Sequence, residues 1–280
     1  MREIRVWYDR NFTKQNYLKV VFMDVGQGDA TYFQFKNGTQ MLVDCSKDRR
    51  VLHALGKQMW FYDRTLDYLV VTHPDLDHYG GCIDVLERYR VKNIIYTGVR
   101  KSDSKFWHSF WNRYKRENSN YITIAESKSM KISSSSLHFL YPNQDLSKNR
   151  KLPNSKEEIS ANNTSIVFKV NYLNSSLLMP GDAEHKLEQY LTKEYSTDLQ
   201  ADVYKMGHHG SSGSSKPFFI KKIEPNHSIA SAGKDNSFDH PSYRTIKRLK
   251  KVGSKIWRTD KDGDITVRIY KNDIKIETES

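Results

Sequence analysis

The stretch THPDLDH at residues 72–78 follows the apolar run LDYLVV at residues 66–71, which has the composition of a buried strand. Four metal-binding side chains stand within six residues of this stretch: His73, Asp75, Asp77 and His78. Imidazole and carboxylate groups at this spacing can reach two points on opposite sides of one tight loop, as a dinuclear metal site requires. The alternative is a solvated acidic turn with two incidental histidines.

Further residues of the same chemical kind follow other apolar segments. Asp44 comes after MLV at 41–43, Asp182 after LLMPG at 177–181, and the pair His208 and His209 after the segment 201–207. Side chains at the ends of several strands can converge on one edge of a sheet, and the two oxygens of Asp182 can each serve one of two cations about 3.5–4 Å apart. A single aspartate after glycine is more commonly a helix N-cap, but the whole constellation favours a metal site.

Length and composition predict one α/β domain over residues 1–280. The 45 Lys and Arg residues against 33 Asp and Glu residues give a formal net charge of +12. Such a surplus favours contact with a polyanion such as nucleic acid, an anionic polymer or an anionic membrane surface. The alternative is that the extra lysines only make the surface soluble.

The N-terminal segment and the cysteines bear on location. The first ten residues interleave charges and lack the apolar region of a secretory signal, and no apolar run approaches the roughly 20 residues of a membrane span. These features predict a soluble, cytoplasmic protein without membrane insertion. Cys45 and Cys82 show no CxxC spacing, so we expect no disulfide framework and no thiolate metal site, but two small apolar side chains in a reducing compartment.

Hydrophobic periodicity and turn residues predict an alternation of strands and helices. The expected strands are 18–25, 30–36, 40–44, 66–72, 93–97, 121–125, 137–141, 164–172, 175–179, 201–206, 228–232, 255–258 and 264–270, and the expected helices are 49–60, 79–89, 103–118, 183–195, 215–223 and 241–252. The polar segment 143–161 is predicted to be a mobile surface loop. Two β-then-α halves predict two sheets packed face to face with helices on the outside.

The ordered motifs resemble those of the metallo-β-lactamase fold, namely Val43-Asp44, the His-x-Asp-x-Asp-His run, Gly181-Asp182 and HHGS at 208–211. Other segments resemble more particularly the hydrolase domain of ComEC-type DNA-internalisation competence proteins: FMDVGQGDA at 22–30, Asp75 in the second motif, KMGHHGS at 205–211, DHP at 239–241 and TDKDG at 259–263. These motifs run from about residue 20 to residue 269. The resemblance implies a four-layer αββα sandwich.

The resemblance also implies a ligand set for two divalent metal ions. One ion would be held by His73, Asp75 and Asp182, and the other by Asp77, His78, Asp182 and one of His208 or His209. The sequence does not decide between the two histidines; we prefer His208 as the ligand and expect His209 to meet substrate or to orient a ligand. Asp44 would accept a hydrogen bond from a ligating imidazole.

Two positions depart from the broader family. Asp75 stands where most members have histidine, and the third-motif histidine has no counterpart, because Asn162 and Asn163 occupy the corresponding stretch. Asn163 is expected to support a ligand by hydrogen bonding. Oxygen ligands in place of imidazole make Mn²⁺ or Mg²⁺ credible beside Zn²⁺, so the identity of the metal stays open.

The expected chemistry is hydrolysis of a phosphodiester by a metal-activated hydroxide. Asp77 would orient the nucleophile, and His240 would protonate the leaving group, unless His240 only precedes a helix that begins at Pro241. Ser211, Ser212 and Lys205 are expected to bind substrate, with the amides of the turn 210–215 forming an anion cradle. The alternative for this turn is a flexible Ser/Gly connector.

Two basic segments are candidates for contact with DNA. The segment KFWHSFWNRYKR at 105–116 carries Trp107, Trp111 and Tyr114 on one helical face, which could stack on unpaired bases or, as we favour, pack on the domain. The segment 244–251 carries Lys247, Arg248, Lys250 and Lys251, and its alternative interpretation is a solvated face.

The leading hypothesis from the sequence is a metal-dependent phosphodiesterase, a nuclease acting on DNA or another phosphodiester. One alternative is an esterase for small phosphoesters, phosphorylcholine-type esters or small nucleotides. Another is a catalytically silent module that binds nucleic acid or protein. Hydrolysis of β-lactams is disfavoured, because no secretory signal and no imidazole-rich first site are present. The sequence does not identify a protein partner.

Overall fold

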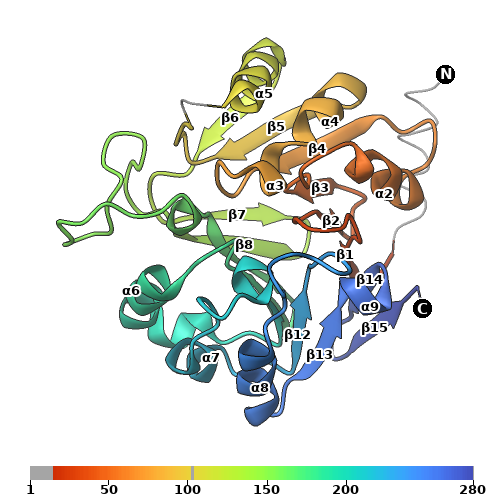
Figure 1. Ribbon diagram of the computed structural model, residues 1–280. Helices are drawn as coiled ribbons and strands as arrows, with labels where there is room; N and C mark the ends of the chain where they lie inside the picture. The colour runs from red at the N-terminus through yellow and green to blue at the C-terminus, as the bar shows by residue number, and fades with distance from the viewer. Residues whose placement is uncertain (1–14, 102–103, 280) are drawn as a thin grey trace.

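The computed structural model describes residues 15–101 and 104–279 and contains two β-sheets with helices on their outer faces (Figure 1). The first sheet has the strand order β15-β14-β1-β2-β3-β4-β5-β6, and the second has the order β13-β12-β11-β10-β9-β8-β7. The strands of the first sheet are β1 (Leu18–Phe22), β2 (Thr31–Gln34), β3 (Gln40–Val43), β4 (Thr65–Val70), β5 (Arg90–Tyr96), β6 (Asn120–Thr123), β14 (Ile265–Ile269) and β15 (Ile274–Thr278). Those of the second sheet are β7 (Lys128–Ile132), β8 (Ser135–Tyr141), β9 (Val167–Tyr172), β10 (Ser175–Met179), β11 (Val203–Lys205), β12 (His227–Ala230) and β13 (Lys255–Arg258).

Each sheet contains a run of parallel strands. Strands β3 to β6 pair in parallel in the first sheet, and β10 to β13 pair in parallel in the second. Parallel strands need crossover connections, which are supplied here by helices. The carboxyl ends of parallel neighbours meet at one edge of a sheet, so the loops after β3, β4, β10 and β11 are brought to the same side of the molecule.

The helices form two outer layers. Helices α2 (Arg50–Gln58), α3 (Leu76–Tyr79), α4 (Cys82–Arg88) and α5 (Lys105–Arg116) are connected to the first sheet, and α6 (His185–Tyr195), α7 (Pro217–Ile223) and α8 (Tyr243–Lys251) to the second. A further short helix, α9 (Thr259–Asp262), precedes β14. This arrangement confirms the predicted four-layer αββα sandwich (Figure 1).

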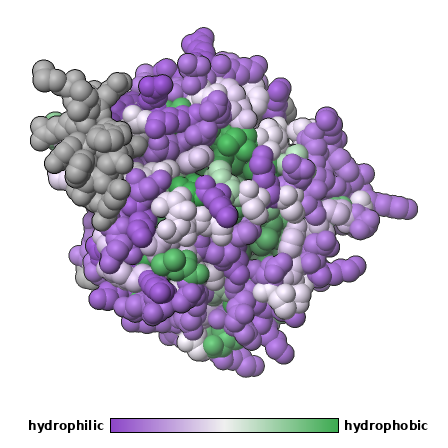
Figure 2. All heavy atoms as spheres, turned by 180° about the vertical axis from the view of Figure 1, so that it is seen from behind, coloured by the Kyte–Doolittle hydropathy of each residue, from purple (hydrophilic) through white to green (hydrophobic). Residues whose placement is uncertain are grey.

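Three clusters of buried apolar side chains hold the layers together. The central one lies between the sheets and includes Phe33 and Val43 from the first sheet with Phe139 and Phe168 from the second. The other two pack the helices onto the outer faces of the sheets. Burial of apolar surface is the main force that stabilises such layers, at roughly 25 cal/mol per Å². The face opposite to that of Figure 1 is mostly hydrophilic, with small hydrophobic areas near its centre (Figure 2).

Several expected elements differ from the observed ones. The helix expected at 79–89 is observed as α4, from Cys82 to Arg88, and the separate short helix α3 precedes it. Gly80 lies between the two, in close contact with the loop before α2, since an added Cβ would lie 2.3 Å from the carbonyl oxygen of Lys47. The strands β7 and β15 and the helix α9 were not predicted. Helix α8 begins at Tyr243, with Ser242 as its N-cap, so His240 lies in the preceding loop.

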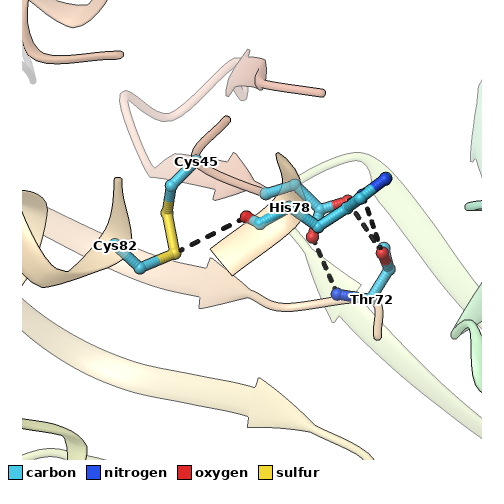
Figure 3. Close-up of a disulfide and its surroundings, with 5 residues drawn as sticks. Cys45, Thr72, His78 and Cys82 are labelled. Atoms are coloured by element: carbon cyan, nitrogen blue, oxygen red, sulfur yellow. Dashed lines mark hydrogen bonds and ion pairs between the residues drawn. A yellow bond between two sulfur atoms is a disulfide. The ribbon is translucent and has the colours of Figure 1, made fainter. Parts of the chain in front are cut away.

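The expectation that the two cysteines stay unpaired is wrong. Cys45, two residues after the end of β3, and Cys82, at the start of α4, form a disulfide with a Cα–Cα distance of 5.1 Å (Figure 3). Spacing in the sequence gave no sign of this contact, because it depends on how the loop after β4 folds back onto β3. Disulfides of this kind persist in oxidising compartments, so the cysteines no longer support a reducing one.

The aromatic helix α5 packs on the domain, as we favoured. Trp107 is 2% exposed, and its ring lies 4.8 Å from that of Tyr79 in an edge-on arrangement. Trp111 stacks on Tyr114 at 4.7 Å, and the guanidinium of Arg100 lies 4.5 Å from the Trp111 ring. The face predicted from the spacing is therefore used for packing.

The polar segment 143–161 is joined to the domain at two points. Leu146 and Ile159 are buried in the cluster beneath α6 and α7, and Lys151 forms an isolated bridge with Glu158. The mobility of this segment stays a prediction.

Candidate metal centre

The carboxylate of Asp182 is the centre of a group of imidazoles. Its Oδ2 atom lies 3.3 Å from Nε2 of His78, 3.6 Å from Nε2 of His209, 3.9 Å from Nε2 of His208 and 4.0 Å from Nε2 of His73. The histidines come from the loops after β4 and β11, and Asp182 follows β10. The two sheets thus bring residues far apart in the sequence to one point.

Several of these atoms are buried without a hydrogen bond. In the described part of the chain, Nε2 of His73, Nε2 of His78 and Oδ1 of Asp182 have no hydrogen-bond partner, although all three residues are almost completely buried. Buried polar atoms normally have partners, since leaving one unsatisfied costs roughly 1–3 kcal/mol. Imidazole nitrogens and carboxylate oxygens directed at one another are the donor set of a divalent metal site, so the residues fit the metal ions that the sequence predicts.

The cluster has two parts that share Asp182. We call Asp77, His78 and His209, together with Asp182, the His78 half-site; the ligand atoms of Asp77, His78 and His209 all lie within 4.8 Å of one another. We call His73 and Asp75, together with Asp182, the His73 half-site. In it, Oδ2 of Asp75 lies 3.4 Å from Nε2 of His73, while its Oδ1 is paired with the ammonium of Lys101 at 2.6 Å.

Of the two neighbouring histidines after β11, His209 lies deeper in the cluster. It is 1% exposed, its Nδ1 lies 3.0 Å from the carbonyl oxygen of Ser231, and its Nε2 lies 3.2 Å from Oδ2 of Asp77. Because a carbonyl only accepts, Nδ1 carries a proton, so Nε2 is the nitrogen that would bind a metal ion once its own proton is displaced. His208 is more exposed, and its Nδ1 lies 3.4 Å from Oε1 of Glu184. The geometry therefore favours His209 over His208 as a ligand.

The backbone at this point is in a left-handed conformation. His208 has a φ of 48° and His209 a φ of 53°. Two successive non-glycine residues in this region are unusual, and such strain persists only where the surrounding structure imposes it. Here it turns the His209 side chain inward, toward Asp182.

Asp44 holds the imidazole of His78 in place. Its Oδ2 lies 2.8 Å from Nδ1 of His78 and also accepts from the hydroxyl of Thr72 at 2.8 Å, while its Oδ1 accepts from the amide of Thr72 at 2.8 Å. A carboxylate can only accept, so Nδ1 of His78 donates and Nε2 is free to bind a metal. This is the contact expected for Asp44 from the sequence.

Asp29 is a member of the site that the sequence analysis did not single out. It is 1% exposed and lies 3.3 Å from Nδ1 of His209 and 2.5 Å from the ammonium of Lys205. The segment FMDVGQGDA contained a signal for this role of Asp29. An aspartate followed by apolar residues is expected to be buried with them, and a buried charged residue needs a partner.

Lys205, which was expected to bind substrate, lies buried beneath the cluster. Lys205 is 1% exposed, and its ammonium is occupied by Asp29 and by the carbonyl oxygen of Met206 at 3.2 Å. The inward alternation of β11 directs this side chain beneath the cluster rather than to the surface. Its positive charge therefore acts on the cluster from the buried side, next to Asp29.

Burial and ion pairing shift the pKa values of the cluster in opposite directions. Burial works against ionisation of Asp182, but the positive charge of His78 and His209 holds the pKa of this carboxyl well below its usual range. Burial likewise opposes a charge on His209, yet the carboxylates of Asp182, Asp29 and Asp77 raise the pKa of its imidazole to about 10. The carboxylates of the site therefore attract cations strongly, and a divalent metal ion would take the place of protons on the imidazoles.

Asn163 lies behind the site. Its Oδ1 accepts from the amide of Glu184 at 2.9 Å, which fixes the loop after Asp182, and its Nδ2 lies 3.1 Å from Oγ of Ser160. The neighbouring Asn162 is the one closer to the histidines, with its Nδ2 3.4 Å from Nδ1 of His208. The support expected from Asn163 thus acts on the backbone next to Asp182.

The turn after His209 is held by several hydrogen bonds. The buried carboxylate of Glu188 accepts from the amides of Ser215 at 2.5 Å and Lys216 at 3.0 Å, and Ser211 accepts from the amides of Gly213 at 3.1 Å and Ser214 at 3.2 Å. The amides of Gly213, Ser214 and Ser215 thus already have acceptors within the protein, and the anion cradle expected for the turn 210–215 stays a prediction. Binding of substrate by the Ser211 and Ser212 hydroxyls stays a prediction.

His240 stands beside the cluster in the loop before α8. Its ring lies 5.5 Å from that of His208 and 6.3 Å from that of His209, and its Nδ1 is buried without a hydrogen bond in the described part of the chain. Burial, together with the positive charge of these two histidines, lowers the pKa of His240 to about 4. His240 is therefore neutral near pH 7, which favours hydrogen bonding to substrate over donation of a proton by an imidazolium.

Fold and site together define a class of protein. The metallo-beta-lactamase superfamily model matches residues 23–234, and this chain belongs to that superfamily. Members of the superfamily are generally metal-dependent hydrolases, in agreement with the cluster around Asp182. In the described residues, no helix combines the length and the apolar character that crossing a membrane demands.

The more particular resemblance to competence proteins is also confirmed. The chain is 27% identical to ComE operon protein 3 of Bacillus subtilis, over 91% of this chain and 33% of that protein. It is 28% identical to Recombination protein 2 of Haemophilus influenzae, over 91% of this chain and 29% of that protein, and 27% identical to Competence protein ComA of Neisseria gonorrhoeae, over 76% and 27%. The chain thus spans about a third or less of the length of these relatives.

Solved structures support the fold. The metallo-beta-lactamase fold protein YhfI from Bacillus subtilis matches with a TM-score of 0.57 at 10% identity, covering 90% of this chain and 99% of that one. The diiron β-hydroxylase CmlA from Streptomyces venezuelae matches with a TM-score of 0.58 at 14% identity, covering 91% and 54%. At these identities the likeness concerns the fold alone.

Proposed function

We propose that this protein is a metal-dependent phosphodiesterase that cleaves DNA. The observation that carries the proposal is the convergence of four imidazole Nε2 atoms within 4.0 Å of one oxygen of Asp182. Among the described residues, Nε2 of His73, Nε2 of His78 and Oδ1 of Asp182 are buried there without a hydrogen-bond partner. A centre of this composition suits two divalent cations bridged by one carboxylate.

The two half-sites would each hold one ion. Asp77, His78 and His209 would bind one, His73 and Asp75 the other, and Asp182 both. Zn²⁺ suits the imidazole-rich His78 half-site, whereas the carboxylate of Asp75 in the His73 half-site also suits Mn²⁺ or Mg²⁺. When bound, the ions supply an activated hydroxide and neutralise the charge of the phosphoryl group.

The protein's own residues position this centre. Asp44 and the carbonyl of Ser231 keep the Nδ1 protons on His78 and His209, so that both Nε2 atoms face the metals. Asp77 is 34% exposed in its side chain and lies at the mouth of the site, where it would orient the attacking water. His240, neutral near pH 7, would donate or accept a hydrogen bond at the substrate. His208 is left to contact the substrate.

The choice of DNA rests on charge and on the relatives. The net charge of +12 favours a polyanionic substrate, because phosphate contacts with Lys and Arg dominate binding to nucleic acid. The relatives that match most of this chain carry names of competence and recombination proteins. A stretch matching about a third of each of them suggests a similar role for this part of the molecule.

The test is cleavage of end-labelled single-stranded and double-stranded DNA by metal-stripped protein after separate addition of Mn²⁺, Zn²⁺ or Mg²⁺. Bis(p-nitrophenyl) phosphate serves as a small diester in parallel, and Asp182→Ala as the inactive control. We expect cleavage of DNA that depends on both the metal and Asp182.

Each other outcome has a definite meaning. Hydrolysis of the small diester with intact DNA would replace the nuclease by an esterase for small phosphoesters. Salt-sensitive binding of DNA without turnover under any of the three metals would indicate a silent binding module. Cleavage that persists in Asp182→Ala would show that the activity comes from elsewhere.

A further inference from the structure

A polar pocket lies beside the metal centre. It has a volume of about 280 Å³ and is lined by residues of the turn 26–27, the start of α2 and the loop 233–238. Its lining includes Lys47, Arg50, Lys234 and Phe238. The chemistry of the two half-sites does not involve this pocket.

The pocket is positively charged. Lys47 and Lys234 are exposed, and neither forms an ion pair in the part of the chain that the structure describes. Arg50 is held by Asp48, with its Nε 2.9 Å and its Nη2 3.0 Å from the two carboxylate oxygens. Asp24 also acts on Arg50, and Asp48 also acts on Lys47, but the lining that the structure describes holds three cations and no carboxylate. Helix α2 adds the positive end of its dipole at Arg50.

The walls of the pocket are joined to the metal centre by short, direct contacts. The amide of Asp29 donates to the carbonyl oxygen of Asp77 at 3.1 Å, so the turn that carries Gln27 rests on the ligand loop. Gln27 in turn accepts from the amide of Gly233 at 3.2 Å, where an added Cβ would lie 2.5 Å from the backbone nitrogen of Gln27. The turn 26–29 thus contacts both the wall of the pocket and the loop that carries the ligands.

Aromatic rings continue from the pocket to the centre. Phe238 is 65% exposed, and its ring stacks on that of His240 at 5.8 Å with an angle of 26° between the planes. His240 then lies beside His208 and His209. Asn236 holds the loop in this shape, because its Oδ1 accepts from the amide of His240 at 3.0 Å and its Nδ2 donates to the carbonyl of His240 at 2.6 Å.

We propose that this pocket is a nucleotide subsite of a single-stranded substrate, in which Lys47 and Lys234 bind the phosphate next to the scissile one and Phe238 stacks on its base. The proposal rests on the proposed phosphodiesterase function and adds the substrate class. Cations that follow the backbone and an exposed ring beside them are the two elements with which proteins bind unpaired strands. A volume of about 280 Å³ lies near the lower end of the range of small-ligand pockets, roughly 300–1,000 Å³, and so suits a single nucleotide unit.

The test compares the double variant Lys47→Gln/Lys234→Gln and the variant Phe238→Ala with the matched control Lys128→Gln/Lys131→Gln on the edge strand β7. Substrates are a labelled single-stranded oligonucleotide and bis(p-nitrophenyl) phosphate. We expect the double variant to lower kcat/KM for the oligonucleotide by about tenfold or more. The slope of log(kcat/KM) against the logarithm of the salt concentration should become less steep by about one. Phe238→Ala should lower it by about five- to a hundredfold. The pocket variants should hydrolyse the small diester at the wild-type rate. The control variant should match the wild-type protein with both substrates.

The outcomes separate this proposal from the phosphodiesterase. If wild-type protein cleaves the oligonucleotide but the pocket variants lose nothing, or lose both substrates equally, the subsite is refuted and the phosphodiesterase stands. If wild-type protein cleaves neither substrate, the phosphodiesterase fails, and the pocket is judged by anisotropy of the labelled oligonucleotide in EDTA. Salt-sensitive binding that is lost in the double variant would then support the pocket, and absence of binding would overturn it.

Discussion

The two halves of the metal cluster differ in how firmly their ligands are held. In the His78 half-site, each imidazole has an acceptor on Nδ1: Asp44 at 2.8 Å from His78, and the carbonyl of Ser231 at 3.0 Å from His209. In the His73 half-site, the hydroxyl of Thr72, at 3.1 Å, is the only partner of His73 Nδ1 among the described residues. Its second ligand, Asp75, is paired with Lys101.

A dinuclear site can therefore have ligands that are firmly oriented around one metal ion and less firmly oriented around the other. Acceptors on Nδ1 fix the tautomer and orientation of a ligand before the metal arrives, whereas an ammonium paired with a carboxylate competes with the metal for it. We therefore expect one ion to bind tightly in the His78 half-site and the second to bind more weakly in the His73 half-site.

The largest effect is expected for Asp182→Asn, because both half-sites share this carboxylate. The amide carries no charge, so both ions should be lost and hydrolysis should fall by about a thousandfold or more, as several kcal/mol of charge stabilisation disappear. Metal content after dialysis and the rate of hydrolysis measure this effect, with the exposed Asp198→Asn as control. A folded Asp182→Asn protein with two metals would contradict the shared ligand.

The variants His78→Ala and His73→Ala test the comparison directly. His78→Ala should weaken the tight site by about a hundredfold or more, whereas His73→Ala should retain one tightly bound ion and lose only the weaker one. Isothermal titration of metal-stripped protein with Zn²⁺ and Mn²⁺ distinguishes the two, and His138→Ala on β8 is the matched control. Equal losses in both variants would show that the half-sites are alike.

The disulfide should support the His78 half-site in particular. Cys82 lies four residues after His78, and its sulfur is 3.9 Å from the carbonyl oxygen of that residue (Figure 3). We expect Cys45→Ser/Cys82→Ser to lower the free energy of unfolding by about 2–4 kcal/mol, since the bond constrains the unfolded chain. Denaturant unfolding measures the loss, and wild-type protein in reductant should behave like the double variant. Free thiols in the oxidised wild-type protein would refute the pairing.

Asp44→Asn should have a smaller effect, confined to the support of one ligand. The amide can present a donor to Nδ1 of His78, which would favour the wrong tautomer and lower the affinity of the tight site by about 10- to 100-fold. Metal titration checks this value, and Asp84→Asn in α4 is the control. An unchanged affinity would mean that the hydrogen bond does not prepare His78.

The smallest effect is expected for Lys101→Gln, and it goes in the opposite direction. Removing the competing cation frees Asp75, so the weaker site should bind its ion more tightly, by up to about fivefold, because exposed ion pairs contribute only about 0.2–1 kcal/mol. Titration of the second metal equivalent is the measurement, with Lys105→Gln as control. Weaker binding of the second ion would show that Lys101 instead helps to position Asp75.

Much of the fold could be predicted from local patterns. The strands β10 and β13 begin and end at the predicted residues, and the order of motifs predicted both the sandwich and the edge where the ligands meet. The ends of buried strands could be predicted from the sequence, because an apolar run indicates a buried strand, and the runs before Asp44 and Asp182 stop close to these carboxylates. The short edge strands β7 and β15 have few buried side chains, so periodicity gave little signal for them.

The candidate site was predictable in kind but not in detail. His73, Asp75, Asp77, His78 and Asp182 were expected together and lie together, and Asp44 makes the contact expected of it. The geometry favours His209 where we preferred His208, and it buries Lys205 against an unforeseen Asp29. These details depend on contacts between loops that are distant in the chain.

The sequence by itself determined which chemical groups stand at the ends of the strands, because burial of apolar residues and strand periodicity are local properties. Only the tertiary structure decided which of two adjacent histidines faces Asp182, since that depends on the left-handed backbone at 208–209. It also decided that Cys45 meets Cys82 and that Asp29 meets Lys205. Such pairs form where closed layers bring remote loops together, and no local pattern in the chain encodes that distance.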